Sequence, residues 1–458
     1  MNHTQKYDVA IIGAGTAGLN AWRAATGAGA HAVLIDPGPL GTTCARVGCM
    51  PSKLLIAASE LAHSARRASE FGVLAETVHI DPVATLERVR RFRDFFVNKT
   101  LGGIQRIDDK GAIIHEKAHI TGPHTIQAGD HEIVAGSIIL ATGSKPWVPA
   151  PYRDLGDRLL TNESIFELPR LPESLLVVGA GAIGLELGQA FHRLGTRVTI
   201  VELDDRIGAI EDPEVAQRAR ELFGEELDMH LHHQLEQVRP TDTGVEIRFI
   251  GDDGEPRQAE YQYVLAATGR RPVLEGLGLE NACLEPLPAM NPETRQLGTS
   301  HFFVAGDASA DRMLLHEAAY EGRIAGTNAA SFPEVHSEAR MTPLALVFSD
   351  PEIAVAGKRF PELDLESDLV ESMDFESQSR AKVLGRAHGR MRVYADPTGR
   401  LLGATVMGPD AEHLGHQLAW LIQLGLTAQD ALKLPFYHPV LEEGLQGVLR
   451  SIAEKAKG

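Results

Sequence analysis

Two glycine-rich segments of the chain repeat one pattern in the same register. Residues 7–18 (YDVAIIGAGTAG) and 175–184 (LLVVGAGAIG) each join a short apolar strand to a G-x-G-x-x-G turn. The motif glycines are Gly13, Gly15 and Gly18 in the first copy and Gly179, Gly181 and Gly184 in the second. In each copy a second apolar strand ends in an acid, Asp36 or Glu202, and both the first glycines and the acids are 166 positions apart. One such motif is a weak indication, but two complete copies predict two dinucleotide-binding βαβ units.

Each glycine of the motif has a physical task. The first permits the tight turn, the second lets the backbone approach a pyrophosphate, and the third lets helix and strand pack closely. The pyrophosphate binds at the helix N-terminus, where the amides and the helix dipole favour an anion. Asp36 and Glu202 are then placed to accept hydrogen bonds from ribose hydroxyls. The alternative, a glycine-rich turn without a ligand, is disfavoured because both copies carry the acid.

Three further strands end in residues suited to line a ligand crevice. Residues 137–146 and 263–272 each end a strand in A-T-G-x-x-P, and residues 301–309 end one in Gly306-Asp307. A glycine there lets the chain turn close to a ligand, and an acid at a strand's carboxyl end reaches the crevice. Two dinucleotide sites in one chain predict electron transfer between them. One dinucleotide is expected to be a flavin, because a nicotinamide needs a partner that passes electrons on to sulfur.

Two of the three cysteines lie close together in residues 41–53 (GTTCARVGCMPSK). Their spacing fits neither a zinc-ligand pair nor a C-x-x-C motif, so these residues alone leave two unrelated thiols and a redox pair about equally open. Residues 53–68 have a helical pattern and Pro51 suits the first turn of that helix, so Cys49 is expected at the helix N-terminus, which stabilises a thiolate. Residues five apart in a regular helix lie too far apart for a disulfide, so Cys44 is expected in a loop or a distorted first turn.

Length, net charge and cysteine content limit the number of domains, the partners and the location of the protein. A chain of 458 residues is expected to form about three domains. The net charge of −18 disfavours nucleic acid and anionic membrane surfaces as partners. No apolar run reaches the length of a membrane helix, no secretory signal is evident, and the low cysteine content favours a cytoplasmic protein. A third domain is expected from about residue 340, with a hairpin over 390–408 and helices over 411–425 and 440–457.

Together with 438-HPVLEE-443 near the end of the chain, these motifs resemble the FAD-dependent pyridine nucleotide–disulfide oxidoreductases. The resemblance covers essentially the whole chain and leans toward the dihydrolipoamide dehydrogenases of that family. It implies an α/β fold with two Rossmann-like domains and a C-terminal α+β dimerisation domain. The implied FAD domain spans 1–149 and 271–340, the NAD domain spans 150–270, and the dimerisation domain spans 341–458.

The resemblance also assigns roles to individual residues. Cys44 is implied to meet the substrate and Cys49 to face the flavin, with Lys53 paired to Glu186 beside the flavin ring. His438 of one subunit, oriented by Glu443, is implied to complete the active site of the other subunit in a homodimer. Further implied cofactor contacts are Thr43, Ala118, Ala141, Thr142, Gly143, Gly269, Asp307, Leu315 and His316. No metal site is expected, and Cys283 is interpreted as a bystander.

Fewer residues indicate which nucleotide and which dithiol the protein uses than indicate its family. Glu202 favours NAD over NADP, because a carboxylate there binds a ribose hydroxyl and repels a 2′-phosphate, and Arg206 is the nearest cation. Ala182 stands where glutathione reductases often carry a tyrosine. The preferred hypothesis is a dithiol oxidoreductase that passes electrons from a dihydrolipoyl group, free or on a partner protein, through a Cys44–Cys49 disulfide and FAD to NAD.

Three departures from the family pattern keep alternatives open. Thr42 stands where glycine is common, Arg46 where an aliphatic residue is common, and Val440 where threonine is usual. An arginine beside the disulfide selects an anionic substrate or is simply solvated. The first alternative is an NAD(P)H-dependent reductase of another disulfide or of a metal ion. An alternative of a different class is a redox sensor that holds FAD without turnover.

Overall fold

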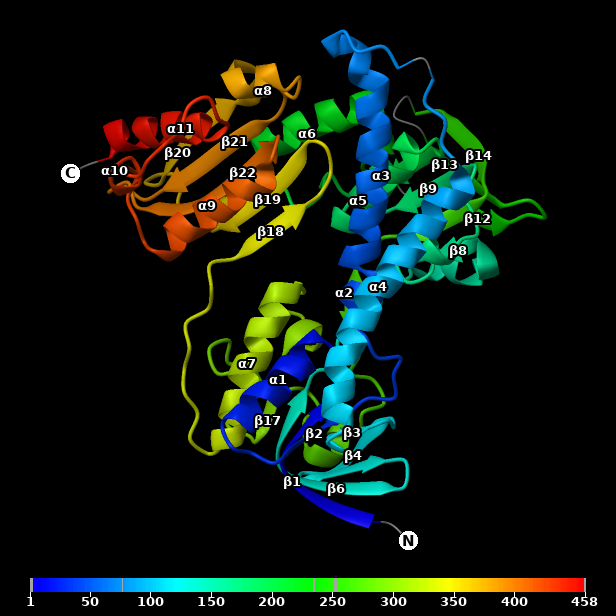
Figure 1. Cartoon of the computed structure of the whole chain (residues 1–458), viewed down its shortest axis with the longest axis vertical. Helices are drawn as coiled ribbons and strands as arrows, with labels where there is room; N and C mark the ends of the chain where they lie inside the picture. The colour runs from blue at the N-terminus through cyan, green and yellow to red at the C-terminus, as the bar shows by residue number, and fades with distance from the viewer. Residues whose placement is uncertain (1–2, 76, 234, 251–253, 457–458) are drawn as a thin grey trace. The chain divides into compact units, whose positions relative to one another are not determined.

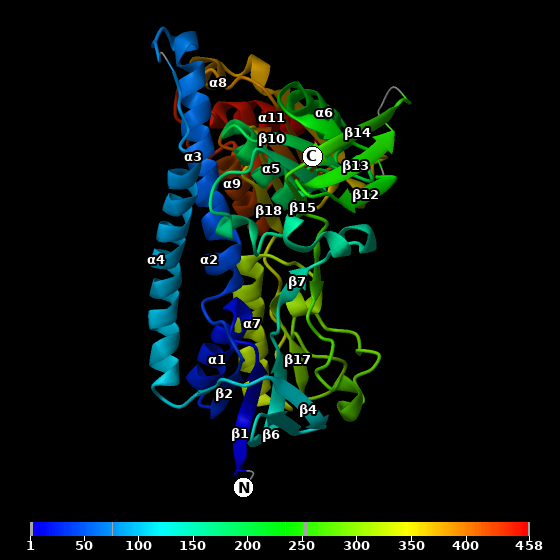
Figure 2. The same cartoon turned by 90° about the vertical axis from the view of Figure 1, so that its right-hand side faces the viewer.

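The computed structural model describes residues 3–75, 77–233, 235–250 and 254–456 (Figures 1 and 2). The chain forms two compact units, each assembled from three segments. The first unit comprises Met1–Pro51, Arg90–Trp147 and Arg270–Arg340, and the second comprises Ser52–Val89, Val148–Gly269 and Met341–Gly458. In each unit, segments distant in the sequence therefore share one core.

A seven-stranded sheet forms the centre of the first unit. Its order is β3-β2-β1-β6-β5-β4, and β17 also pairs with β6. The strands β3, β2, β1, β6 and β17 run parallel, whereas β4 and β5 join as an antiparallel extension. Their bounds are β1 His3–Ile12, β2 Ala32–Ile35, β3 Ile113–Ile114, β4 Ala118–Gly122, β5 Thr125–Ala128, β6 His131–Leu140 and β17 Phe302–Val304.

Two helices lie side by side against this sheet, α1 (Thr16–Gly27) and α7 (Leu315–Ser331) (Figures 1 and 2). Buried Ala17, Leu19 and Trp22 of α1 join the apolar core on that face. A second apolar cluster covers the other face of the sheet, so its central strands are buried on both sides. A short antiparallel pair, β7 Ser144–Pro146 with β16 Arg270–Pro272, completes the strands of this unit.

The second unit contains a parallel sheet of the same βαβ kind. Its order is β11-β10-β9-β15-β8, and every strand pair in it is parallel. The helix α5 (Ala182–Arg193) follows β9, and α6 (Pro213–Glu226) begins at the side-chain cap of Asp212. The strand bounds are β8 Leu159–Leu160, β9 Ser174–Val178, β10 Arg197–Val201, β11 Asp228–His230 and β15 Tyr263–Ala266. A separate antiparallel sheet contains β12 Gln237–Pro240, β13 Val245–Ile250 and β14 Pro256–Tyr261.

An antiparallel sheet, β18-β19-β22-β21-β20, is built from the end of the chain. The strands are β18 Leu344–Val347, β19 Glu352–Gly357, β20 Leu369–Asp374, β21 Arg390–Ala395 and β22 Leu401–Gly408. The helix α9 (Ala411–Gln423) packs on β19 and β22, and α11 (Glu442–Lys455) packs on β20 (Figure 1). The predicted hairpin is therefore present as β21 and β22, and the two predicted helices are present as α9 and α11.

The remaining helices lie in the connections between strands or near the end of the chain. Two long helices are α3 (Cys49–Arg67) and α4 (Pro82–Asp108), and three short ones are α2 (Thr43–Val47), α8 (Ser379–Val383) and α10 (Ala428–Ala431). The 3-10 helices are η1 Ala68–Phe71, η2 Ala150–Arg158, η3 Ile165–Glu167, η4 Leu279–Ala282, η5 Gly306–Ser309, η6 Phe360–Glu362 and η7 Phe375–Ser377. None of the helices that the structure describes is both long and apolar enough to cross a membrane. The predicted α/β class is confirmed.

Candidate active site

The first glycine turn connects β1 to α1 and packs against the strand end at residue 141. Gly13 has φ +109°, and a Cβ there would lie 2.3 Å from the carbonyl oxygen of Ala141. A Cβ at Gly18 would lie 1.9 Å from the carbonyl oxygen of Gly13, so neither position accepts a side chain. Gly15 caps α1, and a Cβ there would meet nothing within 4 Å. The open position therefore lies at the helix N-terminus, where a pyrophosphate fits.

The second turn, between β9 and α5, repeats these contacts. Gly179 has φ +108°, and its Cβ would lie 2.5 Å from the carbonyl oxygen of Ala267. A Cβ at Gly184 would lie 1.8 Å from the carbonyl oxygen of Gly179, whereas Gly181 caps α5 with open space around it. Both turns thus leave the same middle glycine open, as a dinucleotide requires.

Each predicted ribose acid braces its own glycine turn. The Ala14 amide donates to Asp36 at 2.6 Å, and the Ala180 amide donates to Glu202 at 2.7 Å. The other oxygen of Glu202 accepts from the Leu203 amide at 2.7 Å. These bonds fix each carboxylate at its strand end beside the turn, a bracing role that sequence reasoning missed.

The first A-T-G motif lies beside the predicted Asp307. The Thr142 hydroxyl oxygen is buried and has no hydrogen-bond partner among the described residues. The Ser144 hydroxyl donates to Asp307 at 2.5 Å, and the Arg270 Nε donates to Ser144 at 2.8 Å. An unsatisfied buried hydroxyl and an acid held by a neighbour fit a polar cofactor at this strand end. Sequence reasoning did not single out Ser144, although it directly follows the motif.

The other predicted cofactor contacts are spread over several parts of the chain. Ala118 begins β4 and is buried, Leu315 begins α7 and is exposed, and His316 follows it. Gly143 and Gly269 have φ +70° and +98°, and a Cβ at either would meet nothing within 4 Å, although Gly269 ends a segment of the second unit. The cofactor contacts of these five residues stay predictions.

The cysteine pair spans a break between two helices. Cys44 lies in α2 and is half-buried, and Cys49 is the first residue of α3 and is exposed. The expectation of a loop or a distorted first turn at Cys44 is therefore wrong. The chain leaves the helical path at Gly48, with φ −122° and ψ −117°, where a Cβ would lie 3.1 Å from the carbonyl oxygen of Thr43. Thr43 itself begins α2 and is exposed.

Two departures from the family pattern shape the loop before this pair. Thr42 has φ 63°, a region that glycine favours, and holding a β-branched residue there costs of order 1–3 kcal/mol. Its hydroxyl accepts a long bond, 3.4 Å, from the Ala45 amide. The Arg46 guanidinium donates to the Pro39 carbonyl at 3.0 Å. This hydrogen bond links α2 to the loop that precedes it.

Lys53 and Glu186 form an ion pair of 2.7 Å within the second unit. The Glu186 side chain is 8% exposed, and its second oxygen accepts from the Phe348 amide at 2.9 Å. The Lys53 ammonium also lies 4.3 Å from the centroid of the Phe348 ring. The structure therefore joins the two predicted residues and adds Phe348, whose backbone contribution leaves no signal in a sequence.

His438 and Glu443, for which an acid–base role was predicted, lie within hydrogen-bond distance of each other. The Nδ1 atom of His438 lies 2.8 Å from Glu443, whose other oxygen accepts from the Val440 amide at 3.1 Å. These two hydrogen bonds, that of His438 first, hold the pKa of the Glu443 carboxyl below its usual value. The last helix begins two residues later than predicted, because α11 starts at Glu442 and not at residue 440. The carboxylate therefore comes from the first turn of α11.

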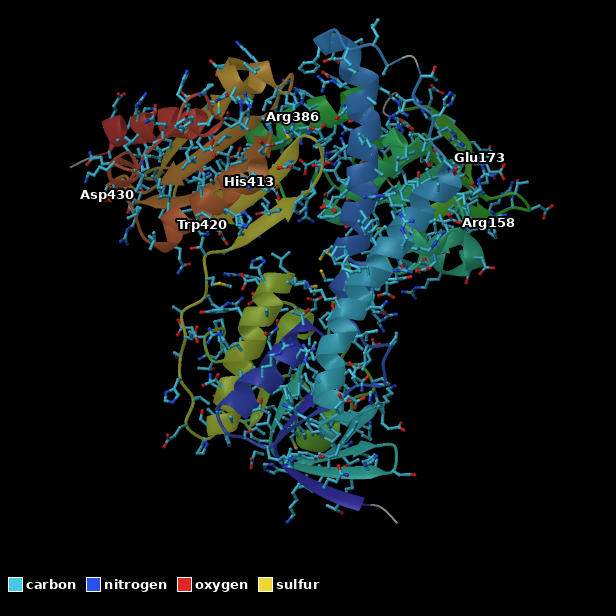
Figure 3. All side chains as sticks on the ribbon, viewed as in Figure 1. Arg158, Glu173, Arg386, His413, Trp420 and Asp430 are labelled. Atoms are coloured by element: carbon cyan, nitrogen blue, oxygen red, sulfur yellow. The ribbon has the colours of Figure 1, made fainter. Side chains whose placement is uncertain are left out.

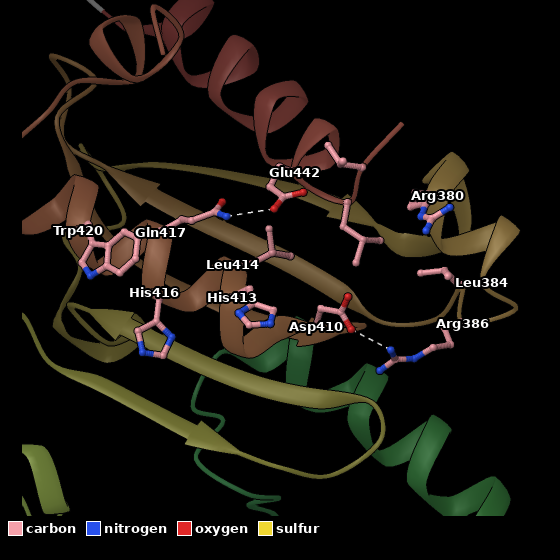
Figure 4. A pocket seen from close by; sticks show the side chains of 12 residues that line it. Arg380, Leu384, Arg386, Asp410, His413, Leu414, His416, Gln417, Trp420 and Glu442 are labelled. Atoms are coloured by element: carbon pink, nitrogen blue, oxygen red, sulfur yellow. Dashed lines mark hydrogen bonds and ion pairs between the residues drawn. The ribbon is translucent and has the colours of Figure 1, made fainter. Parts of the chain in front are cut away.

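A cavity of about 670 Å³ opens in the C-terminal part of the second unit, and the segment after His438 contributes to its wall. Arg386 points toward Asp410 at 2.8 Å, and the Gln417 amide donates to Glu442 at 3.1 Å (Figure 4). Arg386 is also labelled in the side-chain view (Figure 3). Two polar pairs of the cavity wall, Arg386 with Asp410 and Gln417 with Glu442, are thus hydrogen-bonded to each other.

Two family models match the chain. Residues 7–322 match the pyridine nucleotide-disulphide oxidoreductase model, and residues 344–448 match the model of its dimerisation domain. The chain belongs to the pyridine nucleotide–disulphide oxidoreductase family. The expected family, enzyme class and cofactors, FAD and NAD, are thereby confirmed. The dimerisation domain also favours a homodimer.

Curated relatives and solved structures agree with this assignment. The dihydrolipoyl dehydrogenase of Haloferax volcanii is 33% identical over 98% of this chain and 96% of that protein. That of Geobacillus stearothermophilus is 30% identical over 94% and 93%. LpdA from Mycobacterium tuberculosis is 25% identical with a TM-score of 0.82 and covers 98% and 99% of the two chains. The flavoprotein disulfide reductase RclA from Escherichia coli, at 23% identity and a TM-score of 0.80 over 97% and 99%, supports the fold alone.

Proposed function

We propose that this flavoprotein disulfide oxidoreductase oxidises a dihydrolipoyl-type dithiol and passes the electrons to NAD+. The observation that carries the proposal is the His438–Glu443 pair at 2.8 Å, because a thiol substrate needs a base to become a nucleophile. The names of the relatives, dihydrolipoyl dehydrogenases at about 30% identity, support the substrate class.

The proposed proton step uses the histidine and its carboxylate. Glu443 receives the Nδ1–H of His438, which leaves Nε2 to take the proton of the incoming thiol. The carboxylate then stabilises the imidazolium that forms, as the third group of a catalytic triad does. Its lowered pKa keeps Glu443 ionised in this role at neutral pH.

The proposed sulfur steps balance two electrons. The substrate thiolate attacks the sulfur of Cys44 in a Cys44–Cys49 disulfide, and Cys49 leaves as a thiolate at the N-terminus of α3. The second substrate thiol, after losing its proton, attacks the substrate sulfur of this mixed disulfide. The cyclic substrate disulfide departs, and Cys44 is released as a thiolate. The substrate loses two electrons, and the cysteine pair gains them.

The glycine turns are the proposed cofactor sites. The turn at Gly15, with Asp36, would hold FAD, and the turn at Gly181, with Glu202, would hold NAD. When bound, these cofactors carry the electron pair from the reduced cysteines to NAD+. The Lys53 ammonium, held by the buried Glu186 carboxylate, would place a positive charge beside the flavin ring.

We place His438 against the cysteines of a second subunit. The His438 side chain is 77% exposed, and the preceding Tyr437 is 80% exposed. Trp420 and Leu424 on and after α9 are also exposed large apolar residues. Such residues on a soluble protein favour a contact with another protein surface. A dimerisation domain in the same part of the chain makes a second copy the expected partner.

The test is an anaerobic steady-state assay of the flavin-loaded enzyme with dihydrolipoamide and NAD+. We expect rapid NADH formation that is abolished in Cys44→Ser and lowered about 10²- to 10⁴-fold in His438→Gln. Retention of flavin by both variants is the control for folding. Negligible NADH formation by the fully flavin-loaded wild-type enzyme would contradict the dihydrolipoyl assignment. Activity in the reverse sense, with NADH or NADPH and other disulfides or metal ions, would then favour the first alternative.

A further inference from the structure

An ion pair lies two residues after Glu202, the acid that directly follows β10. Asp204 accepts two hydrogen bonds from the Arg206 guanidinium, 3.0 Å from Nε and 2.9 Å from Nη2, on the same oxygen. Its other oxygen accepts from the Arg206 backbone amide at 2.9 Å. Asp204 therefore holds both the main chain and the side chain of Arg206 in one turn.

This turn lies next to the proposed ribose acid. Glu202 is fixed by the Ala180 amide, and one of its oxygens also faces the Asp204 amide at 3.4 Å. In dinucleotide sites of this kind, the acid binds the ribose 2′-hydroxyl of NAD, whereas the 2′-phosphate of NADP needs a nearby arginine. Arg206 is the nearest cation in the sequence, and its charge is already matched by Asp204.

The electrostatics agree with the geometry. The hydrogen bond to Arg206 is the main cause that lowers the pKa of Asp204, and the same bond raises the pKa of Arg206. The segment from Glu202 to Arg206 carries three carboxylates and one guanidinium. A phosphate that arrived there would meet net negative charge and an arginine bonded elsewhere.

We propose that Asp204 is a specificity-determining residue that excludes NADP by holding Arg206. Glu202 selects the ribose hydroxyl, and Asp204 keeps the adjacent guanidinium from binding a 2′-phosphate. This inference rests on the proposed NAD site of the second unit, and it does not depend on which dithiol the enzyme oxidises.

Asp204→Asn is the informative substitution, because asparagine keeps an oxygen for the Arg206 amide and removes the charge. The matched control is Asp205→Asn, which removes the same charge one residue away. Asp205 is 57% exposed against 45% for Asp204, and its nearest cation is Arg220 at 3.8 Å. The probes are adenosine 2′,5′-bisphosphate and 5′-AMP, titrated calorimetrically into the full-length protein.

We expect Asp204→Asn to bind adenosine 2′,5′-bisphosphate at least about fivefold more tightly than the wild type, the gain of an exposed charge pair. The affinity for 5′-AMP should stay within about twofold, and Asp205→Asn should show neither gain. Adding Arg206→Gln to Asp204→Asn should cancel the gain, because the released guanidinium is its source.

Two results would overturn the inference. One is an unchanged affinity of Asp204→Asn for adenosine 2′,5′-bisphosphate when 5′-AMP still binds. The other is an equal gain in Asp205→Asn, which would make the effect one of overall charge. The two affinities are measured without thiol turnover. They therefore test this inference even if dihydrolipoamide proves not to be a substrate.

Discussion

At the scale of single residues, the pair of Lys53 and Glu186 illustrates what a sequence reveals. The pairing of residues so far apart in the chain was predicted from the family motifs, and the structure brings the two atoms to 2.7 Å. The backbone amide and the ring of Phe348 were not predicted, because the donor is a main-chain group that every residue except proline carries. Thr42 shows the same limit, since its positive φ depends on how the whole loop closes.

Because Glu186 is buried and Lys53 is partly exposed, we expect different stability losses when each member of this pair is replaced. Lys53→Met should destabilise the protein by about 2 kcal/mol, because it leaves a buried charge without its partner while Lys53 itself is partly exposed. Glu186→Gln should cost less, since the glutamine oxygen still accepts from the Phe348 amide. Urea unfolding followed by circular dichroism measures both values. Equal losses in the two variants would show that the buried charge does not dominate.

At the scale of elements, the two glycine turns were the most predictable part of the fold. Their strands, helices and acids all follow from local patterns, and each turn has the same contacts in the structure. Helix boundaries were less predictable. The chain breaks between α2 and α3 at Gly48, and α11 starts only at Glu442; the local pattern specifies neither position.

Substitutions at two glycines of the second turn should distinguish an effect on folding from an effect on nucleotide binding. Gly184→Ala places a Cβ 1.8 Å from a backbone oxygen, so we expect little folded protein. Gly181→Ala meets no atom within 4 Å and should fold with an unchanged melting temperature, yet bind NAD+ about tenfold or more weakly, because the methyl group blocks the approach of the pyrophosphate. Thermal unfolding and calorimetric titration with NAD+ measure these effects. Normal NAD+ affinity in Gly181→Ala would exclude this turn as the nucleotide site.

At the scale of the whole molecule, the repeat predicted the α/β class and the presence of two dinucleotide units. The assembly of each compact unit from three separate segments is a long-range property, and local patterns do not specify it. The proposed active site extends further still, because it needs two copies of the chain. The exposed His438–Glu443 pair and the dimerisation domain motivate that arrangement.

A heterodimer of two inactive subunits tests the shared site. One subunit carries Cys44→Ser and the other His438→Gln, each with its own affinity tag. If the histidine serves the partner's cysteines, one of the two sites is intact, and the activity should be about half that of a doubly tagged wild-type dimer. If each subunit used its own histidine, both sites would lack a residue and the heterodimer would be as inactive as its parents.

The ion pair between Asp204 and Arg206 has a consequence for the history of such enzymes. Aspartate and asparagine codons differ by a single base, so one point mutation releases the arginine while the turn keeps its oxygen acceptor. That mutation would weaken the exclusion of NADP without an insertion, a new loop or a change in the fold, while Glu202 would still select the ribose hydroxyl.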